Sequence, residues 1–163
     1  FPNEPSLPEG AEPNGPFDGS NGLFFWELFF HLPHLVASRL RDEHRFLEAQ
    51  QWFHYLFDPQ APEKGAQDDI GKQVAYWRCR PLALKHGTIA YEAFAPTDPD
   101  AIAYSSPKHY QIVVFLDYVH NIMAWGDWLY RQLTRDSLAA AKMHHVRALY
   151  LMGRAPDNRT RPT

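Results

Sequence analysis

The sequence lacks the features that define a disulfide-rich scaffold, a thiolate metal centre or a nucleotide-binding fold. Its 163 residues include a single cysteine, Cys79, so an intrachain disulfide and a zinc site built from several thiolates are both excluded. The formal net charge is -3 and the basic residues do not cluster, which gives no electrostatic reason to expect a nucleic acid as partner. No glycine-rich phosphate loop and no G-x-S-x-G nucleophile elbow occur in the sequence.

The sequence also lacks an apolar run long enough to cross a membrane, which requires about 20 residues. Its most apolar stretch, FFWELFFHLPHLVASRL at residues 24–40, is interrupted by Glu27, His31, Pro33 and His34. A helix lying in the membrane interface would need a strongly basic polar face, and this stretch has none. We therefore expect no direct membrane insertion by this segment.

The composition is that of a folded domain. Hydrophobic residues make up 45% of the chain and aromatic residues 15%, which excludes a largely disordered protein. We interpret residues 1–22 as an extended Pro/Gly-rich loop or linker, residues 23–153 as a helical domain and residues 154–163 as a flexible polar tail. In this interpretation both ends are cuts from a longer polypeptide.

The first half of the chain predicts an antiparallel helical hairpin. Residues 23–41 carry apolar side chains on more than one face, which is typical of a deeply buried helix. Pro33 should kink or interrupt that helix near residues 29–32. Residues 42–57 continue with apolar side chains at helical spacing, and a joint as short as residues 41–43 brings the two helices side by side.

The middle of the chain, residues 60–104, predicts a loop-rich connection. Residues 74–84 show no clean period, so a short helix, a strand and an irregular segment all remain open there. Further along, Asp98 or Asp100 can cap a short helix.

The second half predicts another pair of helices. Ser106 and Pro107 are suited to the N-cap and first position of a helix. The β-branched residues that follow favour a strand locally, but the cap, the length and the helical spacing of the apolar residues favour a helix. The residues at that spacing are Ile112, Leu116, Val119 and Met123.

The last helix has its own start and stop signals. Gly126-Asp127 predicts the joint before it, Asp136 can cap its beginning, and Gly153 is suited to the position after its end. One apolar stripe runs along it and consists of Leu138, Ala141, His145, Leu149 and Met152.

These elements together predict an all-α fold of antiparallel helix pairs, packed like tetratricopeptide (TPR) repeats, with a loop-rich middle segment. No strict internal repeat accompanies them. The core residues that we predict from this pattern are Leu28, Phe29, Phe53, Leu116, Leu138 and Leu149.

The histidines could in principle bind a metal. His31 and His34 lie one helical turn apart, and a third ligand would have to come from His44, His54 or the His144-His145 pair. Pro33 disturbs the register that would align the first two, and the HExxH spacing of metalloproteases is absent. Partly buried structural histidines are the better interpretation, so we assign no metal site and no cofactor.

Other side chains with possible chemistry have equally plain explanations. Cys79 lies between Arg78 and Arg80, which would activate the thiol if it were exposed, but a lone cysteine beside aromatic residues more often packs in a core. The acidic pairs Asp68-Asp69 and Asp98/Asp100 are typical of a solvated loop and of helix caps. We therefore assign no catalytic residue.

Five blocks of the sequence resemble, in the same order, a region of the A subunits of bacterial insecticidal toxin complexes (Tc toxins). They are NGLFFWELFFHLPHLVASRL at 21–40, FLEAQQWFHYLFDP at 46–59, YWRCRPL at 76–82, DPDAIAYSSPKHY at 98–110 and GDWLYRQLTRDSLAAAKMHHVRALYLMG at 126–153. The sequence departs from the family pattern at two places. Ser105-Ser106 stand before Pro107 where the family has an aspartate, and His144-His145 stand where the family usually has aromatic residues.

The resemblance implies a structural role in a large machine. Tc toxin A subunits are homopentamers with an α-helical shell around a channel, and the matching region would be the C-terminal part of that shell, just before the linker to the channel. Its partners would be other domains of the same subunit, neighbouring protomers and, indirectly, the B and C subunits. The full toxin would be secreted or attached to the bacterial surface.

Two other functions remain open at this stage. The helical hairpin could be a TPR-like module that binds other proteins. A metal- or thiol-dependent enzyme that uses His31 and His34, or Cys79, is the second alternative. A further hypothesis is that some of the nine histidines sense pH, since buried neutral imidazoles resist protonation.

Overall fold

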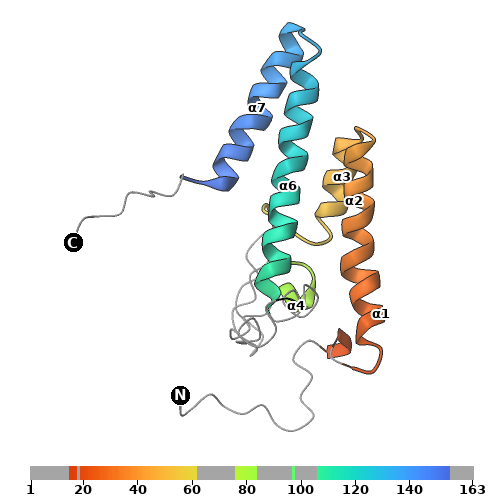
Figure 1. Ribbon diagram of the computed structural model, residues 1–163. Coiled ribbons are helices and arrows are strands. Elements are labelled where there is room, and N and C mark those ends of the chain that lie inside the picture. The colour runs from red at the N-terminus through yellow and green to blue at the C-terminus, as the bar shows by residue number, and fades with distance from the viewer. Residues whose placement is uncertain (1–14, 18, 62–75, 84–96, 98–105, 155–163) are drawn as a thin grey trace, which may run out of the picture.

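The computed structural model describes residues 15–17, 19–61, 76–83, 97 and 106–154, and these residues form two antiparallel helix pairs (Figure 1). Helix α6 lies between α7 on one side and the α2–α3 pair on the other. The all-α prediction is confirmed, because the described residues contain no sheet and only one isolated bridge, between Phe57 and Trp77. The elements are η1 (Gly15–Phe17), α1 (Gly22–Trp26), η2 (Glu27–His31), α2 (Leu32–Asp42), α3 (Phe46–Phe53), α4 (Arg80–Ala83), α6 (Pro107–Tyr130) and α7 (Arg135–Met152).

The first helix changes its winding where Pro33 was expected to disturb it. Segments α1, η2 and α2 follow one another without a gap, and η2 is a π-helical turn. The amide of Leu32 donates to the carbonyl of Glu27, five residues earlier instead of four. The wider turn accommodates the proline, which has no N–H to donate and whose ring would clash with a carbonyl four residues before it.

The joint of the first pair lies slightly later than predicted. Helix α2 continues to Asp42, and the turn occupies residues 43–45, where His44 has a positive φ of 63°. The Arg45 amide donates to the Leu40 carbonyl at 2.9 Å, which closes the turn. Helix α3 is shorter than the predicted 42–57, because the chain leaves it after Phe53 and pairs Phe57 with the 76–78 segment.

The beginning of the second pair is where it was predicted, but its joint and the cap of its second helix are not. Ser106 caps α6 as expected, since its side chain accepts from the Lys108 amide. The joint predicted at Gly126-Asp127 is wrong, because α6 continues to Tyr130. Asp136 does not cap α7; Thr134 does, in a reciprocal pair of hydrogen bonds with Ser137 at 3.1 Å each.

The glycine at position 126 is explained by a contact between α6 and α7, which the local sequence could not reveal. A Cβ atom at this position would lie 2.9 Å from Nε2 of His145 and 3.3 Å from Cβ of His144. The glycine therefore lets α6 and α7 approach closely at this level of the hairpin. At the end of α7, Gly153 has the positive φ expected of a residue that terminates a helix, 71°.

The buried core differs from the predicted one. Of the six predicted core residues only Phe53 is buried, and the other five are between 37% and 66% exposed: Leu28, Phe29, Leu116, Leu138 and Leu149. The largest fully buried side chains are instead Tyr118, Phe53, Leu56, Leu82, Ile122 and Val114. Several helices are apolar on two faces, so helical spacing alone could not identify the face that is buried.

Some predictions concern residues that lie outside the described part of the chain. Asp98 and Asp100, the predicted helix caps, are among them, as is most of the middle segment. Within the described part of the open 74–84 stretch, Trp77 forms the bridge and residues 80–83 form α4. The described helices include none long and apolar enough for a membrane span.

Candidate functional site at the interface of the helix pairs

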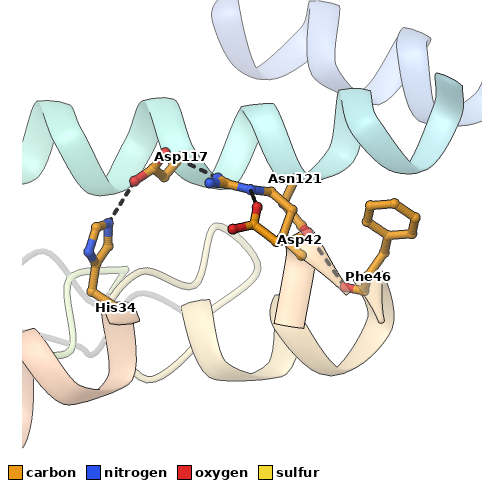
Figure 2. Close-up of polar contacts among 6 residues, drawn as sticks. His34, Asp42, Phe46, Asp117 and Asn121 are labelled. Carbon is orange, nitrogen blue, oxygen red and sulfur yellow. Dashed lines mark hydrogen bonds and ion pairs between the residues drawn. The ribbon is translucent and has the colours of Figure 1, made fainter. Parts of the chain in front are cut away.

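The polar side chains of the described residues converge where the two helix pairs meet. Asp117 of α6 lies at the centre of the first cluster (Figure 2). Its Oδ2 atom is 2.7 Å from Nε2 of His34, and its Oδ1 accepts a hydrogen bond of 3.1 Å from Nη1 of Arg41. His34 and Arg41 are two turns apart on α2, so a single carboxylate holds α2 against α6 at two points.

Asn121 extends this contact by one turn of α6. It is fully buried, and its Nδ2 atom donates to the carbonyl of Phe46 at 3.2 Å, in the first turn of α3. Asp117 and Asn121 thus connect α6 to α2 and to the beginning of α3. We call Asp117, Asn121, His34 and Arg41 the carboxylate clamp.

A second cluster surrounds the hydroxyl of Tyr118, which is fully buried between α3, α6 and α7. Nη2 of Arg147 donates to this oxygen at 2.9 Å, and Nε2 of His54 lies 3.2 Å from it. Because the oxygen already accepts from the guanidinium, its own proton is best donated to a neutral His54. We call Tyr118, His54, Arg147 and Gln50 the tyrosine cluster.

Gln50 completes the tyrosine cluster from α3. With its amide oxygen facing Arg147, it accepts from Nη1 at 3.3 Å and from Nη2 at 3.1 Å. This orientation fits better than the reverse, because a guanidinium group can only donate hydrogen bonds.

Burial changes the proton affinities in the tyrosine cluster. The pKa of Tyr118 is raised, because burial disfavours the phenolate. The pKa of His54 is lowered, first by burial and then by the positive charges of Arg147 and Arg78, against an opposing effect of Asp58. Both shifts favour the neutral forms of these two side chains, which are the forms that the hydrogen-bond arrangement requires.

A column of stacked rings connects the same elements at the other end of α3. His44 stacks on Phe46 with centroids 5.6 Å apart, Phe46 on Trp125 at 6.2 Å, and Trp125 on His144 at 4.3 Å. The column crosses from the α2–α3 turn to α6 and α7. The pKa of His144 is lowered, mainly by its burial in this packing.

The histidines considered as metal ligands contact different partners in different parts of the structure. His31 packs edge-on against Phe30, with ring centroids 5.1 Å apart, while His34 belongs to the carboxylate clamp. His54 and His144 belong to the tyrosine cluster and the ring column. Across the described stretches of the chain, no three His, Cys, Asp or Glu side chains are grouped to hold a metal ion.

Cys79 does not fit the activated thiol considered above. Its side chain is buried, and burial raises its pKa to about 12. This burial agrees with the preferred interpretation that the cysteine packs in the core, since activation by Arg78 and Arg80 would have needed an exposed thiol. Arg78 lies 3.9 Å from Asp58 instead. The acidic pair Asp68-Asp69 lies outside the described residues.

The sequence did contain a signal for the residues that were missed. Asp117 and Asn121 are polar residues four positions apart in the mostly apolar QIVVFLDYVHNIMAW. A polar pair at helical spacing within a buried stretch needs hydrogen-bond partners, so it predicts an interhelical contact. Their partners are distant in sequence and could not be identified from it.

Comparison with known proteins gives close matches over most of the chain. It is 41% identical over 140 residues to toxin subunit YenA2 of Yersinia entomophaga, an alignment that covers 86% of this chain and 10% of YenA2. No family model matches the sequence. The chain thus spans about a tenth of the length of this relative.

Solved structures agree with the sequence match. The cryo-EM structure of Yersinia pseudotuberculosis TcaA-TcaB contains a chain that matches with a TM-score of 0.73 and 38% identity, over 86% of this chain and 8% of that one. Morganella morganii TcdA4 matches with a TM-score of 0.68 and 36% identity, over 88% of this chain and 6% of that one. The identity and the shared fold show that the chain belongs to the A subunits of the Tc toxins, of which it corresponds to one segment.

Proposed function

We propose that this segment is a non-enzymatic scaffold in the α-helical shell of a Tc toxin A subunit. Its task is to pack against neighbouring shell domains and to brace the linker that leads to the channel. The observation that carries the proposal is that the polar side chains between its helices form hydrogen bonds from one helix to another. The carboxylate clamp and the tyrosine cluster use the side chains of Asp117, Tyr118 and Arg147 to connect helices to one another.

The assembly follows from the same proposal. The subunit would form a homopentamer, contact the B and C subunits indirectly, and act outside the bacterial cell, either secreted or at its surface. Support comes from the match to chains of which the aligned segment makes up only 6–10%, so a helical unit of this size is a small part of each of them.

A chimera tests the proposal. The matched 140 residues of YenA2 are replaced by the corresponding part of this chain, and the purified chimera is compared with YenA2 by size-exclusion chromatography with light scattering and by electron microscopy. A chimera of the same mass and shape supports a scaffold function. A chimera that folds but fails to reach that mass would contradict it.

Two variants of the chimera distinguish a structural role of this segment from a catalytic one. Asp117→Ala breaks the carboxylate clamp and should lower the thermal stability of the assembly, whereas Asp136→Ala, at an exposed position of α7, should not. A variant of Asp117 that abolishes toxicity while leaving assembly and stability unchanged would instead indicate a chemical role.

A further inference from the structure

The α6–α7 hairpin has an apolar groove on one side. The groove is a hollow of about 570 Å³ that extends along α7 from Leu138 to Leu149. It is lined by Tyr130, Leu138, Ala141, Lys142, His145, Val146 and Leu149. Lys142 is the single residue with a permanent charge in this lining, so the surface offers few hydrogen bonds and mainly apolar contacts.

One lining residue of the groove, Tyr130, also belongs to an exposed apolar stripe on α6. On α6, Ile112, Leu116, Met123 and Tyr130 follow one another at intervals of four, seven and seven residues and are 41–59% exposed. At 100° per residue they lie about 120–160° around the helix from Tyr118, which faces the tyrosine cluster. The stripe is therefore on a different side of α6 from the one that carries the interhelical clusters.

The dimensions of this surface suit a helix. Helix α7 has 18 residues, which at 1.5 Å per residue gives a length of about 27 Å. Two antiparallel helices present between them a long furrow into which the side-chain ridge of a third helix packs. A row of exposed apolar side chains beside an apolar hollow is a feature of interaction sites.

The length of the relatives indicates where such a helix comes from. The chain corresponds to 10% of YenA2 and to 8% and 6% of the two solved chains, so most of each polypeptide lies outside the matched segment.

We propose that the α6–α7 groove seats one amphipathic α-helix of the same toxin subunit, from polypeptide outside these 163 residues. Its apolar stripe packs on Leu138 and Leu149, and an acidic side chain beside that stripe faces Lys142. The inference rests on the proposed scaffold function and specifies the surface through which the segment is joined to the rest of the shell.

Thiol labelling of the YenA2 chimera tests this docking surface. Leu149→Cys places a thiol in the groove, and Asp136→Cys places one on the exposed first turn of α7, outside the groove. Reaction with a maleimide is followed by mass spectrometry of the peptide that carries each new cysteine. The rate for each variant is divided by its own rate in urea, so that differences in intrinsic reactivity cancel.

We expect the cysteine in the groove, but not the one outside it, to be protected from the maleimide in the native chimera. Leu149→Cys should react at least about ten-fold more slowly in the native chimera than in urea, and Asp136→Cys less than about three-fold more slowly. Equal reactivity at the two positions in a chimera of the correct mass would overturn the docking surface and leave the scaffold function intact. A chimera that fails to assemble would contradict the scaffold function and, with it, the inference.

Two further measurements identify the occupant. A benzophenone attached at Leu149→Cys should cross-link within one polypeptide, and a product of twice the subunit mass would instead place a neighbouring copy in the groove. Lys142→Glu should increase the labelling of Leu149→Cys in the native chimera, because it sets two negative charges against each other. Unchanged labelling would refute the acidic partner.

Discussion

Replacing Tyr118 by phenylalanine removes a single oxygen atom from the point where α3, α6 and α7 meet. The ring and its packing remain, but Nη2 of Arg147 loses an acceptor at 2.9 Å and His54 loses its partner at 3.2 Å. A hydrogen bond to a charged group contributes about 1.5–3 kcal/mol and a neutral one about 1 kcal/mol. Since phenylalanine is easier to bury than tyrosine, we expect a net loss of about 2–3 kcal/mol in the free energy of unfolding.

Urea unfolding of the 163-residue chain, followed by circular dichroism, measures this loss directly. In a thermal scan the same change should lower Tm by roughly 4–12 °C for a domain of this size. Tyr150→Phe is the matched control, because it removes the same atom from a side chain that is 83% exposed. It should change the stability by less than about 0.5 kcal/mol.

A double-mutant cycle sharpens the test. Arg147→Met removes the charged donor, and the combined variant should lose clearly less than the sum of the two single changes, because both break the same contact. The reasoning is refuted if Tyr118→Phe costs no more than the Tyr150→Phe control. Full additivity in the cycle would show that the Arg147 contact contributes nothing to stability.

Four further outcomes follow from the structure. Phe53→Ala should cost about 3–5 kcal/mol in urea unfolding, but Leu28→Ala, at a position 40% exposed, should cost less than about 1 kcal/mol in the isolated chain; equal losses would contradict the burial pattern. Asp117→Ala should lower the unfolding free energy by about 1–3 kcal/mol, because two partners in the carboxylate clamp lose their acceptor, and a change within error would show that the clamp is not stabilising. Because burial lowers the pKa of His54, the unfolded chain protonates first: stability should be full above about pH 6.5 and fall as the pH drops below it, and His54→Gln should reduce this dependence. Cys79, with its pKa raised to about 12, should resist maleimide in the native chain and react once urea unfolds it; rapid native labelling would place it at the surface.

The predictions that succeeded depend on local chemistry. A serine followed by proline predicts the start of a helix wherever it occurs, and Ser106 caps α6 as expected. The same applies to Pro33, whose missing donor forces a change of winding within one turn, and to Gly153, whose positive φ ends α7. None of these residues needs a distant partner to act.

The predictions that failed depend on which other helix lies opposite. Gly126 has the appearance of a joint, but it is the point where α7 comes close to α6, and only the position of His145 explains it. Leu28 and Leu116 are at the same helical spacing as buried residues, yet they face outwards. The unit has more apolar surface than its own helices can cover.

The amino-acid sequence by itself determined the class of the fold, the chemistry of several helix ends and the family, because these depend on neighbouring residues or on the order of a few recognisable blocks along the chain. The tertiary structure alone decided which apolar faces are buried and what the interior polar groups do. The hydrogen-bond partners of Asp117 and Tyr118 lie 29 to 83 residues away along the chain, so the neighbouring sequence does not identify them. These contacts form because one helix pair packs against the other.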